Sequence, residues 1–207
     1  MNKPLIIIGN GGHASVLIET LLAQDGKIIG FTAPNEEGNP FQLRYLGQDD
    51  IVLQYNKSEV ELVLGIGMVG PNSLRAKIYQ YFTQLGYCFK SVIHPTAIIA
   101  PSVTLGEGVQ MMAGAIAQTN AKIADNTIIN TGAQIDHDCM IGENVHIAPG
   151  TVLSGAVTIG EGTHIGTGVT VIQNVTIGKS CLLGAGAVVV KNIADNKTAY
   201  GVPAKEV

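Results

Sequence analysis

One short stretch of the sequence, Asp136-His137-Asp138, combines the residue types that general acid–base chemistry requires. The pKa of histidine lies near neutrality, so its ring can take a proton from an attacking amine or hydroxyl group. A carboxylate beside the ring favours the protonated form and raises its basicity. Neighbouring residues of an extended chain point in opposite directions, so either aspartate remains a candidate partner. The stretch indicates His137 as a general base supported by Asp138 or Asp136, with a solvated turn as the alternative.

Three other polar residues could contribute to a site. Asn130 can donate a hydrogen bond to a substrate or to a thioester oxygen, or it can simply form a turn. His146 and His164 are 18 residues apart, a spacing that a pair of metal ligands would also fit. Two histidines without a third acidic or cysteine ligand nearby are a weak metal signal, so we expect no metal site.

Near the start of the chain, Gly9-Asn10-Gly11-Gly12-His13-Ala14 follows an apolar run and matches the loose pattern G-x-G-x-x-A. Dinucleotide-binding folds place an acidic residue at the end of the second strand, whereas this sequence has Phe31-Thr32-Ala33 there. We therefore expect no dinucleotide. A glycine-rich loop at a helix N-terminus also suits the diphosphate of a nucleotide sugar.

The elements that position these residues fall into two halves with different periods. Residues 1–90 alternate between expected strands and helices, and the segment 32–48 reads as a loop. We expect strands at 4–8, 27–31, 60–66 and 87–92, and helices at 14–22 and 72–85. This order predicts a small Rossmann-like α/β domain.

From Ile93 the period changes to six residues. Sixteen positions spaced six apart, from Ile93 to Leu183, are all apolar, and the fifth place of each hexad is always Val, Ala, Thr or Cys. The pattern predicts a β-helix in which each hexad forms a short strand and a turn, and three hexads form one triangular coil. We expect about five coils over residues 91–190, followed by an irregular tail, 191–207, that lies back over the last coils.

Composition excludes several classes of protein. Lys and Arg number 12 against 16 Asp and Glu, and the resulting charge of −4 without a basic run argues against a nucleic-acid partner. No apolar stretch approaches the ~18 residues of a membrane span, and the N-terminal apolar run is too short for a signal peptide. Three cysteines, Cys88, Cys139 and Cys181, make no disulfide framework. We expect a cytoplasmic protein.

The chain resembles the left-handed β-helix acyltransferases, and more narrowly the bacterial sugar acetyltransferases with a small N-terminal Rossmann-like domain. That group includes N-acetyltransferases of UDP-4-amino-4,6-dideoxy sugars, perosamine N-acetyltransferases and the sialic acid O-acetyltransferase family. The resemblance covers essentially all 207 residues. It rests on the glycine-rich loop, the hexads, Asn130-Thr131-Gly132, Ile135-Asp136-His137-Asp138-Cys139 and the tail segment Gly201-Val202-Pro203-Ala204-Lys205.

The resemblance implies a homotrimer of β-helical prisms with acetyl-CoA in the grooves between neighbours and a nucleotide sugar on the N-terminal domain. It implies that His137 is the base and that Asp138 is its acidic neighbour. The positions that it assigns to acetyl-CoA are His146, Thr167 and Ala185. The positions that it assigns to the nucleotide sugar are Gly11, Gly12, His13, Thr32 and Gly67. Many members carry Asp at the Thr32–Ala33 position, so its absence here leaves the nucleotide open.

The sequence therefore predicts an acetyl-CoA-dependent N-acetyltransferase that acts on a nucleotide-linked amino sugar for surface glycan synthesis. A UDP-4-amino-4,6-dideoxy sugar is the first candidate substrate, and transfer would be direct, with His137 as base. One alternative is O-acetylation of a sugar such as sialic acid. Another is a non-catalytic or metal-binding hexapeptide protein similar to γ-carbonic anhydrase. A zinc site of that kind needs three histidines, and His137, His146 and His164 supply the number but not the expected spacing.

Overall fold

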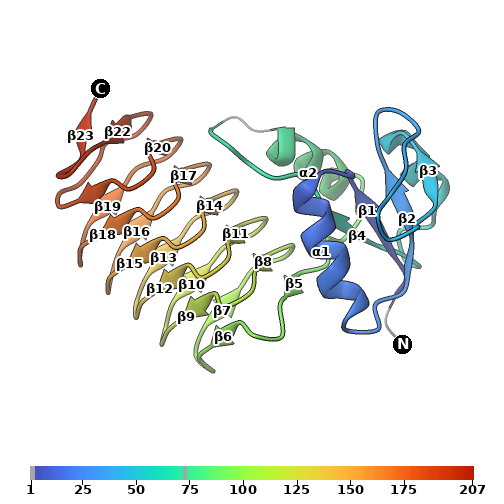
Figure 1. Ribbon diagram of the computed structural model, residues 1–207, viewed down its shortest axis with the longest axis horizontal. Helices are drawn as coiled ribbons and strands as arrows, with labels where there is room; N and C mark the ends of the chain where they lie inside the picture. The colour runs from blue at the N-terminus through green and yellow to red at the C-terminus, as the bar shows by residue number, and fades with distance from the viewer. Residues whose placement is uncertain (1–2, 72–73) are drawn as a thin grey trace. The chain divides into compact units, whose positions relative to one another are not determined.

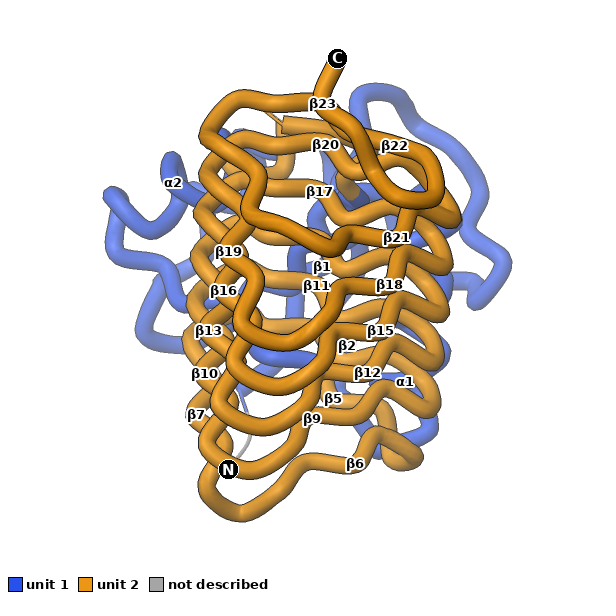
Figure 2. Tube along the Cα trace, turned by 90° about the vertical axis from the view of Figure 1, so that its left-hand side faces the viewer, with its two compact units in different colours: residues 1–67, 77–92 blue, residues 68–76, 93–207 orange. Residues whose placement is uncertain are grey.

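The computed structural model describes residues 3–71 and 74–207. It divides into two compact units, shown by colour in Figure 2: residues 1–67 with 77–92, and residues 68–76 with 93–207. The sequence predicts a single boundary near residue 90, and the structure also assigns the short segment 68–76 to the second unit. Among the helices of the described residues, none is long and apolar enough to cross a bilayer.

The first unit is built on a four-stranded parallel sheet in the order β3-β2-β1-β4. Its strands are β1 (Leu5–Ile8), β2 (Ile28–Thr32), β3 (Tyr45–Gly47) and β4 (Glu61–Leu64) (Figure 1). The connecting helices are α1 (Gly12–Leu22), the 3₁₀ helix η1 (Asp49–Gln54) and α2 (Leu74–Gln84). All four residues of β1 are buried, as in a parallel strand covered on both faces. The predicted Rossmann-like α/β domain is confirmed.

Two details of this unit differ from the prediction. The segment 32–48 contains the edge strand β3, in which Tyr45 pairs with Phe31; three residues among Gly and Pro show no period that a sequence reading could detect. The expected strand at 87–92 is reduced to a bridge between Phe89 and Leu62 and to the short strand β5 (Val92–Ile93). The first two residues of the expected helix at 72–85 lie outside the described residues.

The second unit is a parallel β-helix with three sides, seen as a stack of coils in Figure 2. The first side contains β5 (Val92–Ile93), β8 (Gln110–Met111), β11 (Ile128–Ile129), β14 (His146–Ile147), β17 (His164–Ile165), β20 (Leu182–Leu183), β22 (Thr198–Tyr200) and β23 (Lys205–Glu206). The second side contains β6 (Ile98–Ile99), β9 (Ile116–Ala117), β12 (Gln134–Ile135), β15 (Val152–Leu153), β18 (Thr170–Val171) and β21 (Val188–Val189). The third side contains β7 (Thr104–Leu105), β10 (Lys122–Ile123), β13 (Met140–Ile141), β16 (Thr158–Ile159) and β19 (Thr176–Ile177).

The two constrained columns of the hexads form the interior, as predicted. The apolar residue of each strand faces inward, and Ile135, Ile147 and Ile165 are fully buried. Small residues fill the narrow corners, where buried Thr hydroxyls also bind backbone carbonyls; Thr163 Oγ1 donates to Gly178 O at 2.7 Å. Strand partners one coil apart are 18 residues apart in the sequence, as His146 and His164 show.

The fourth place of each hexad turns the chain at the corners through the left-handed region. Every fourth-place residue from 108 to 186 has a positive φ, and most are Gly or Asn, which adopt this conformation most easily. Asp138 is one of them, with φ 59°. The fourth place of the hexad is therefore constrained as well as the first and the fifth. Its left-handed conformation determines where the side chains at each corner point.

The C-terminal tail is more regular than the sequence predicts. Strand β22 pairs in parallel with β20, and β23 pairs antiparallel with β22, so the first side of the prism continues into the tail. Ile193 and Ala199 are buried in the same core as the hexad residues although the six-residue spacing has ended. The loss of period hides these inward positions from a reading of the sequence.

Candidate active site

His137 and its two flanking aspartates lie at the corner between β12 and β13. The ring Nδ1 of His137 is 2.8 Å from Oδ2 of Asp138. The left-handed backbone of Asp138 folds its carboxylate back onto the preceding ring, and Asn120 from the previous coil donates to Oδ1 of the same carboxylate at 3.1 Å. Asp136 instead accepts the backbone N–H of His137 at 2.7 Å. The structure therefore pairs the imidazole with Asp138, and Asp136 holds the turn.

This pairing gives the ring the electrostatics of a base. The hydrogen bond to Asp138 raises the pKa of His137, and the negative charge of Asp136 adds to the increase. Hydrogen bonds from His137 and Asn120 lower the pKa of Asp138, so its carboxylate stays ionised. With the Nδ1 proton directed to the carboxylate, Nε2 carries the lone pair that can accept a proton. The side chain of His137 is 59% exposed, so a substrate can reach it.

A glycine one coil away makes room for the ring. A Cβ atom at Gly155 would overlap Nε2, Cε1 and Cδ2 of His137. Thr119, one coil before, contributes its backbone carbonyl, which accepts the N–H of Asp138 at 3.0 Å. The ring of His137 therefore lies over Gly155.

We expect Asp138→Asn to change the pH dependence of the candidate base. A base acts in its neutral form, so kcat/KM rises as pH increases through the pKa of His137. Asn keeps an oxygen for Nδ1–H but removes the charge, so the pKa falls and the rising limb moves to lower pH. The maximal rate falls about tenfold because the base is weaker. Asp136→Asn is the matched control, with a smaller shift expected; an unmoved limb in Asp138→Asn would contradict the pairing.

The residues that the resemblance assigns to acetyl-CoA follow another edge of the prism. Thr167 and Ala185 are exposed on the corner between the first and second sides, and Asn130 lies on the same corner two coils earlier than Thr167. His137 is on the corner between the second and third sides. A single chain therefore brings His137 and Asp138 together but keeps them on a different corner from Asn130, Thr167 and Ala185.

His146 connects this edge to the segment 68–76 of the same unit. The ring is 8% exposed; its Nδ1–H donates to Met68 O at 2.7 Å, and its Nε2 lies 3.1 Å from Asn130 Nδ2. Asn130 Oδ1 in turn accepts the N–H of Thr131 at 2.8 Å, which fixes the orientation of the amide. Every residue has a backbone carbonyl, so the sequence does not indicate that His146 binds the carbonyl of Met68.

His164 follows His146 on the next strand of the first side, as its spacing predicts. The two ring centroids are 4.9 Å apart in an edge-on arrangement, and burial lowers the pKa of His164. Within residues 3–71 and 74–207, no group of three or more His, Cys, Asp and Glu side chains is arranged to hold a metal ion. His137, on a different corner, does not join the pair.

In the first unit, the glycine-rich loop leads from β1 into α1 and leaves open space. A Cβ at Gly11 or at Gly12 would meet no atom within 4 Å, and no side chain caps the N-terminus of α1. His13 and Gly67 are neighbours, because a Cβ at Gly67 would be 3.6 Å from the Cβ of His13. The loop thus offers backbone N–H groups to an anion.

Thr32, expected to contact the nucleotide sugar, is fully buried at the end of β2. Its hydroxyl donates to Oδ1 of Asp49 at 2.6 Å. The sequence shows no acidic residue at the end of this strand, yet the first residue of η1 brings a carboxylate there. Sequence reasoning missed Asp49 because 17 residues separate it from Thr32 and the intervening strand β3 was not recognised.

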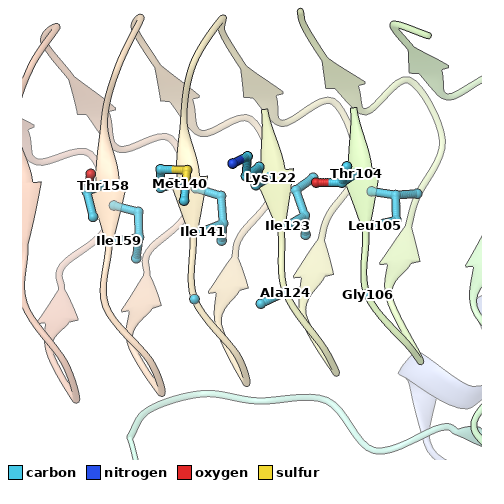
Figure 3. Close-up of a pocket in the computed structure, with 11 residues that line it drawn as sticks. Thr104, Leu105, Gly106, Lys122, Ile123, Ala124, Met140, Ile141, Thr158 and Ile159 are labelled. Atoms are coloured by element: carbon cyan, nitrogen blue, oxygen red, sulfur yellow. The ribbon is translucent and has the colours of Figure 1, made fainter. Parts of the chain in front are cut away.

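A groove of about 530 Å³ runs along the outer face of the third side of the prism. Figure 3 shows that Thr104, Lys122, Met140 and Thr158 form a row across its neighbouring strands, as their parallel register requires. Met140 is 44% exposed and lies three residues after His137 in the sequence, at the start of β13. Met140, a lining residue of the groove, is therefore close in sequence to the candidate base, although His137 itself does not line the groove.

Comparisons with known proteins match both halves of the fold. Residues 4–82 match the PglD N-terminal domain, and residues 120–155 and 156–191 match the bacterial transferase hexapeptide model of six repeats. The structure of PerB from Caulobacter crescentus, in complex with CoA and GDP-perosamine, is 38% identical over all of this chain and 98% of that chain, with a TM-score of 0.91. The same perosamine N-acetyltransferase has also been solved with one histidine replaced by asparagine.

The acetyltransferase domain of PglB from Neisseria gonorrhoeae FA1090, also solved with acetyl coenzyme A, is 35% identical over the full length of both chains, with a TM-score of 0.92. WeeI from Acinetobacter baumannii AYE, at 22% identity and a TM-score of 0.88, shares the fold. Both halves of the chain and their order are thus matched by these proteins. The chain belongs to the bacterial hexapeptide transferases that carry a PglD-type N-terminal domain, a family of acetyltransferases with a left-handed β-helix.

Proposed function

We propose that this chain transfers the acetyl group of acetyl-CoA to the amino group of a nucleotide-linked amino sugar. The observation that carries the proposal is the His137–Asp138 pair, with Nε2 open over Gly155. It occurs in a chain similar over its whole length to an enzyme solved with CoA and GDP-perosamine. A UDP-4-amino-4,6-dideoxy sugar and a GDP-4-amino sugar both carry the amino group that this reaction acetylates, so either can be the acceptor.

The arrangement supports direct transfer. The lone pair of the sugar amine attacks the thioester carbonyl, and His137 Nε2 takes the proton that the nitrogen loses as the C–N bond forms. The tetrahedral intermediate then collapses, the C–S bond breaks, and the CoA thiolate leaves and is protonated by the imidazolium. Asp138 stabilises the imidazolium through Nδ1. The ring returns to its neutral form without an acyl-enzyme.

A homotrimer would complete the site. In one chain the catalytic corner is separate from the edge that carries Asn130, Thr167 and Ala185, whereas a neighbouring copy can set that edge against His137. We propose that acetyl-CoA lies there, held by backbone groups at Thr167 and Ala185, with His146 lining the same edge. The groove on the third side, with exposed Met140, offers apolar surface to the neighbour.

The trimer has a direct physical test. Sedimentation equilibrium is expected to give a mass three times the 21.6 kDa of one chain, independent of concentration in the micromolar range. Met140→Glu places a charge in the groove and is expected to shift the mass towards that of one chain. A wild-type protein that sediments as a monomer and still turns over would contradict a site shared between copies.

We also propose that the enzyme acts in the cytoplasm. Its three cysteines are free thiols, which fits a reducing compartment. A charge of −4 without a basic run argues against nucleic acid as a partner.

The function is tested by following CoA release with a thiol reagent against a panel of acceptors. The panel contains a UDP-4-amino-4,6-dideoxy sugar, GDP-perosamine, and free and CMP-linked sialic acid. Turnover on a 4-amino nucleotide sugar supports the proposal and identifies the nucleotide. Turnover on sialic acid alone would replace it with O-acetylation, the one alternative that the same base can also serve. Binding of acetyl-CoA without turnover on any of them would contradict the proposed acceptor class.

A further inference from the structure

The end of β2 carries a carboxylate that comes from another element. Thr32 is the last residue of β2, and its buried hydroxyl donates to Oδ1 of Asp49, the first residue of η1. Asp49 itself is partly exposed and lines an open cavity of about 470 Å³ together with Pro34, Gln48 and Asp50, whose side chain is exposed. The hydroxyl therefore fixes the carboxylate at the mouth of a cavity in which a ligand can approach it.

This carboxylate is one strand away from the glycine-rich loop. Thr32 is the register partner of Ile8, the last residue of β1, and the N–H of Gly9 donates to Thr32 O at 3.0 Å. Adjacent strands are about 4.8 Å apart. A diphosphate at the N-terminus of α1 would therefore place the attached ribose at the neighbouring strand end, beside Asp49.

The loop that borders the cavity is tied to the glycine-rich loop. Asn10 donates through Nδ2 to Glu37 Oε1 at 3.1 Å and to Gly38 O at 3.0 Å, and its Oδ1 accepts from Asn39 at 2.6 Å. Gln48, next to Asp49, donates to Pro34 O at 2.9 Å. These bonds hold the glycine-rich loop and the loop that borders the cavity at a defined spacing. A site that is ordered in advance loses less conformational freedom when a nucleotide binds.

We infer that Asp49 binds the 2′-hydroxyl of the ribose of the nucleoside diphosphate. In dinucleotide-binding Rossmann folds an acidic residue at the end of the second strand takes this hydroxyl, and here η1 supplies an acidic residue at the strand end that β2 itself lacks. The carboxylate accepts a hydrogen bond from the 2′-hydroxyl, and Thr32 acts through Asp49 as a positioning residue. The ribose is common to all nucleotides, so Asp49 recognises uridine and guanosine diphosphates alike and leaves the choice of base to other residues. The inference rests on the proposed nucleotide-sugar substrate.

The test compares binding of UDP, GDP and their 2′-deoxy forms to the full chain by calorimetry, without acetyl-CoA. The variants are Asp49→Ala and, as a control with the same change of charge, Glu59→Ala, an exposed acidic residue of the same unit. A hydrogen bond to a charged group corresponds to roughly 10–100-fold in affinity. We expect Asp49→Ala to weaken UDP and GDP by at least tenfold and to leave the 2′-deoxy forms as they bind the wild type. Glu59→Ala is expected to bind all four as the wild type does.

The remaining outcomes overturn the inference. Equal losses on ribo and deoxy nucleotides would mean that Asp49 only supports the fold, and a lower melting temperature would accompany them. A loss confined to UDP or to GDP would mean that Asp49 reads the base. Unchanged binding in Asp49→Ala would refute the role of Asp49 while the proposed function stands. A wild-type chain that binds neither UDP nor GDP would refute the proposed nucleotide-sugar substrate and this inference together.

Discussion

His137→Ala is expected to lower kcat for acetyl transfer by about 10²–10⁴-fold, the range that a general base contributes. Without Nε2 the attacking amine must lose its proton to water while the C–N bond forms. The side chain is exposed and is not part of the core, so the variant should fold and melt as the wild type does. Its KM for acetyl-CoA should stay within a few fold, because the loss lies in the chemical step.

His94→Ala is the control for this substitution. His94 is a histidine of the first coil, bonded to Thr96 and outside the proposed site. Single-turnover rates of both variants should be compared with that of the wild type from pH 6 to 9. The His137 variant should also lose the rise in rate that the neutral imidazole gives the wild type. A His137→Ala enzyme within tenfold of the wild-type rate would disprove the assignment of the base.

Gly155→Ala is expected to reduce kcat by about 100-fold although it adds one methyl group. The new Cβ would overlap the ring of His137, and the exposed ring can give way more easily than the packed coil. A displacement of about 1 Å at a reacting group can cost 10²-fold in rate. The free energy of unfolding should change by less than about 0.5 kcal/mol, since the ring moves into solvent.

The matched control is Gln173→Ala, one coil further along the same corner, where the side chain is exposed. It should leave both rate and stability unchanged. Because the displaced ring also loses Asp138, the pH profile of Gly155→Ala should move to lower pH, as in Asp138→Asn. A Gly155→Ala enzyme with normal kcat would show that the ring position in the structure is not the one used in catalysis.

The β-helix could be predicted from the sequence because each residue's role repeats. A column that is apolar sixteen times in succession, from Ile93 to Leu183, specifies both the period and the face that is buried. The tail lacks this redundancy, so the inward positions of Ile193 and Ala199 became visible only in the structure. In the first unit, a three-residue strand such as β3 gives too few residues for any period to appear.

The choice between Asp136 and Asp138 depends on the backbone conformation at the corner rather than on alternation along a strand. Alternation along an extended strand does not distinguish the two aspartates. Asp138 occupies the fourth place of its hexad, where most hexads have Gly or Asn and the backbone is left-handed. That conformation turns its carboxylate back to His137. The periodic signal was therefore sufficient to identify the partner.

Contacts between distant segments could not be predicted in this way. Asp49 reaches Thr32 across 17 residues, and the carbonyl of Met68 reaches His146 across 78. Neither pair has a fixed spacing or a characteristic residue type, and a backbone carbonyl is present at every position. Such contacts depend on how the chain folds back on itself, which a single sequence does not encode in any local pattern.

The central claim is that the group acetylated is an amine, and identification of the product tests it most directly. The wild-type enzyme is incubated with acetyl-CoA and the nucleotide 4-amino sugar that gives turnover, and in parallel with the same sugar carrying a hydroxyl in place of the amine. We predict a product with one added acetyl group that resists alkaline hydroxylamine, as an amide does, and no product from the hydroxyl analogue. An acetyl group that hydroxylamine removes, or acetylation of the hydroxyl analogue alone, would contradict N-acetylation.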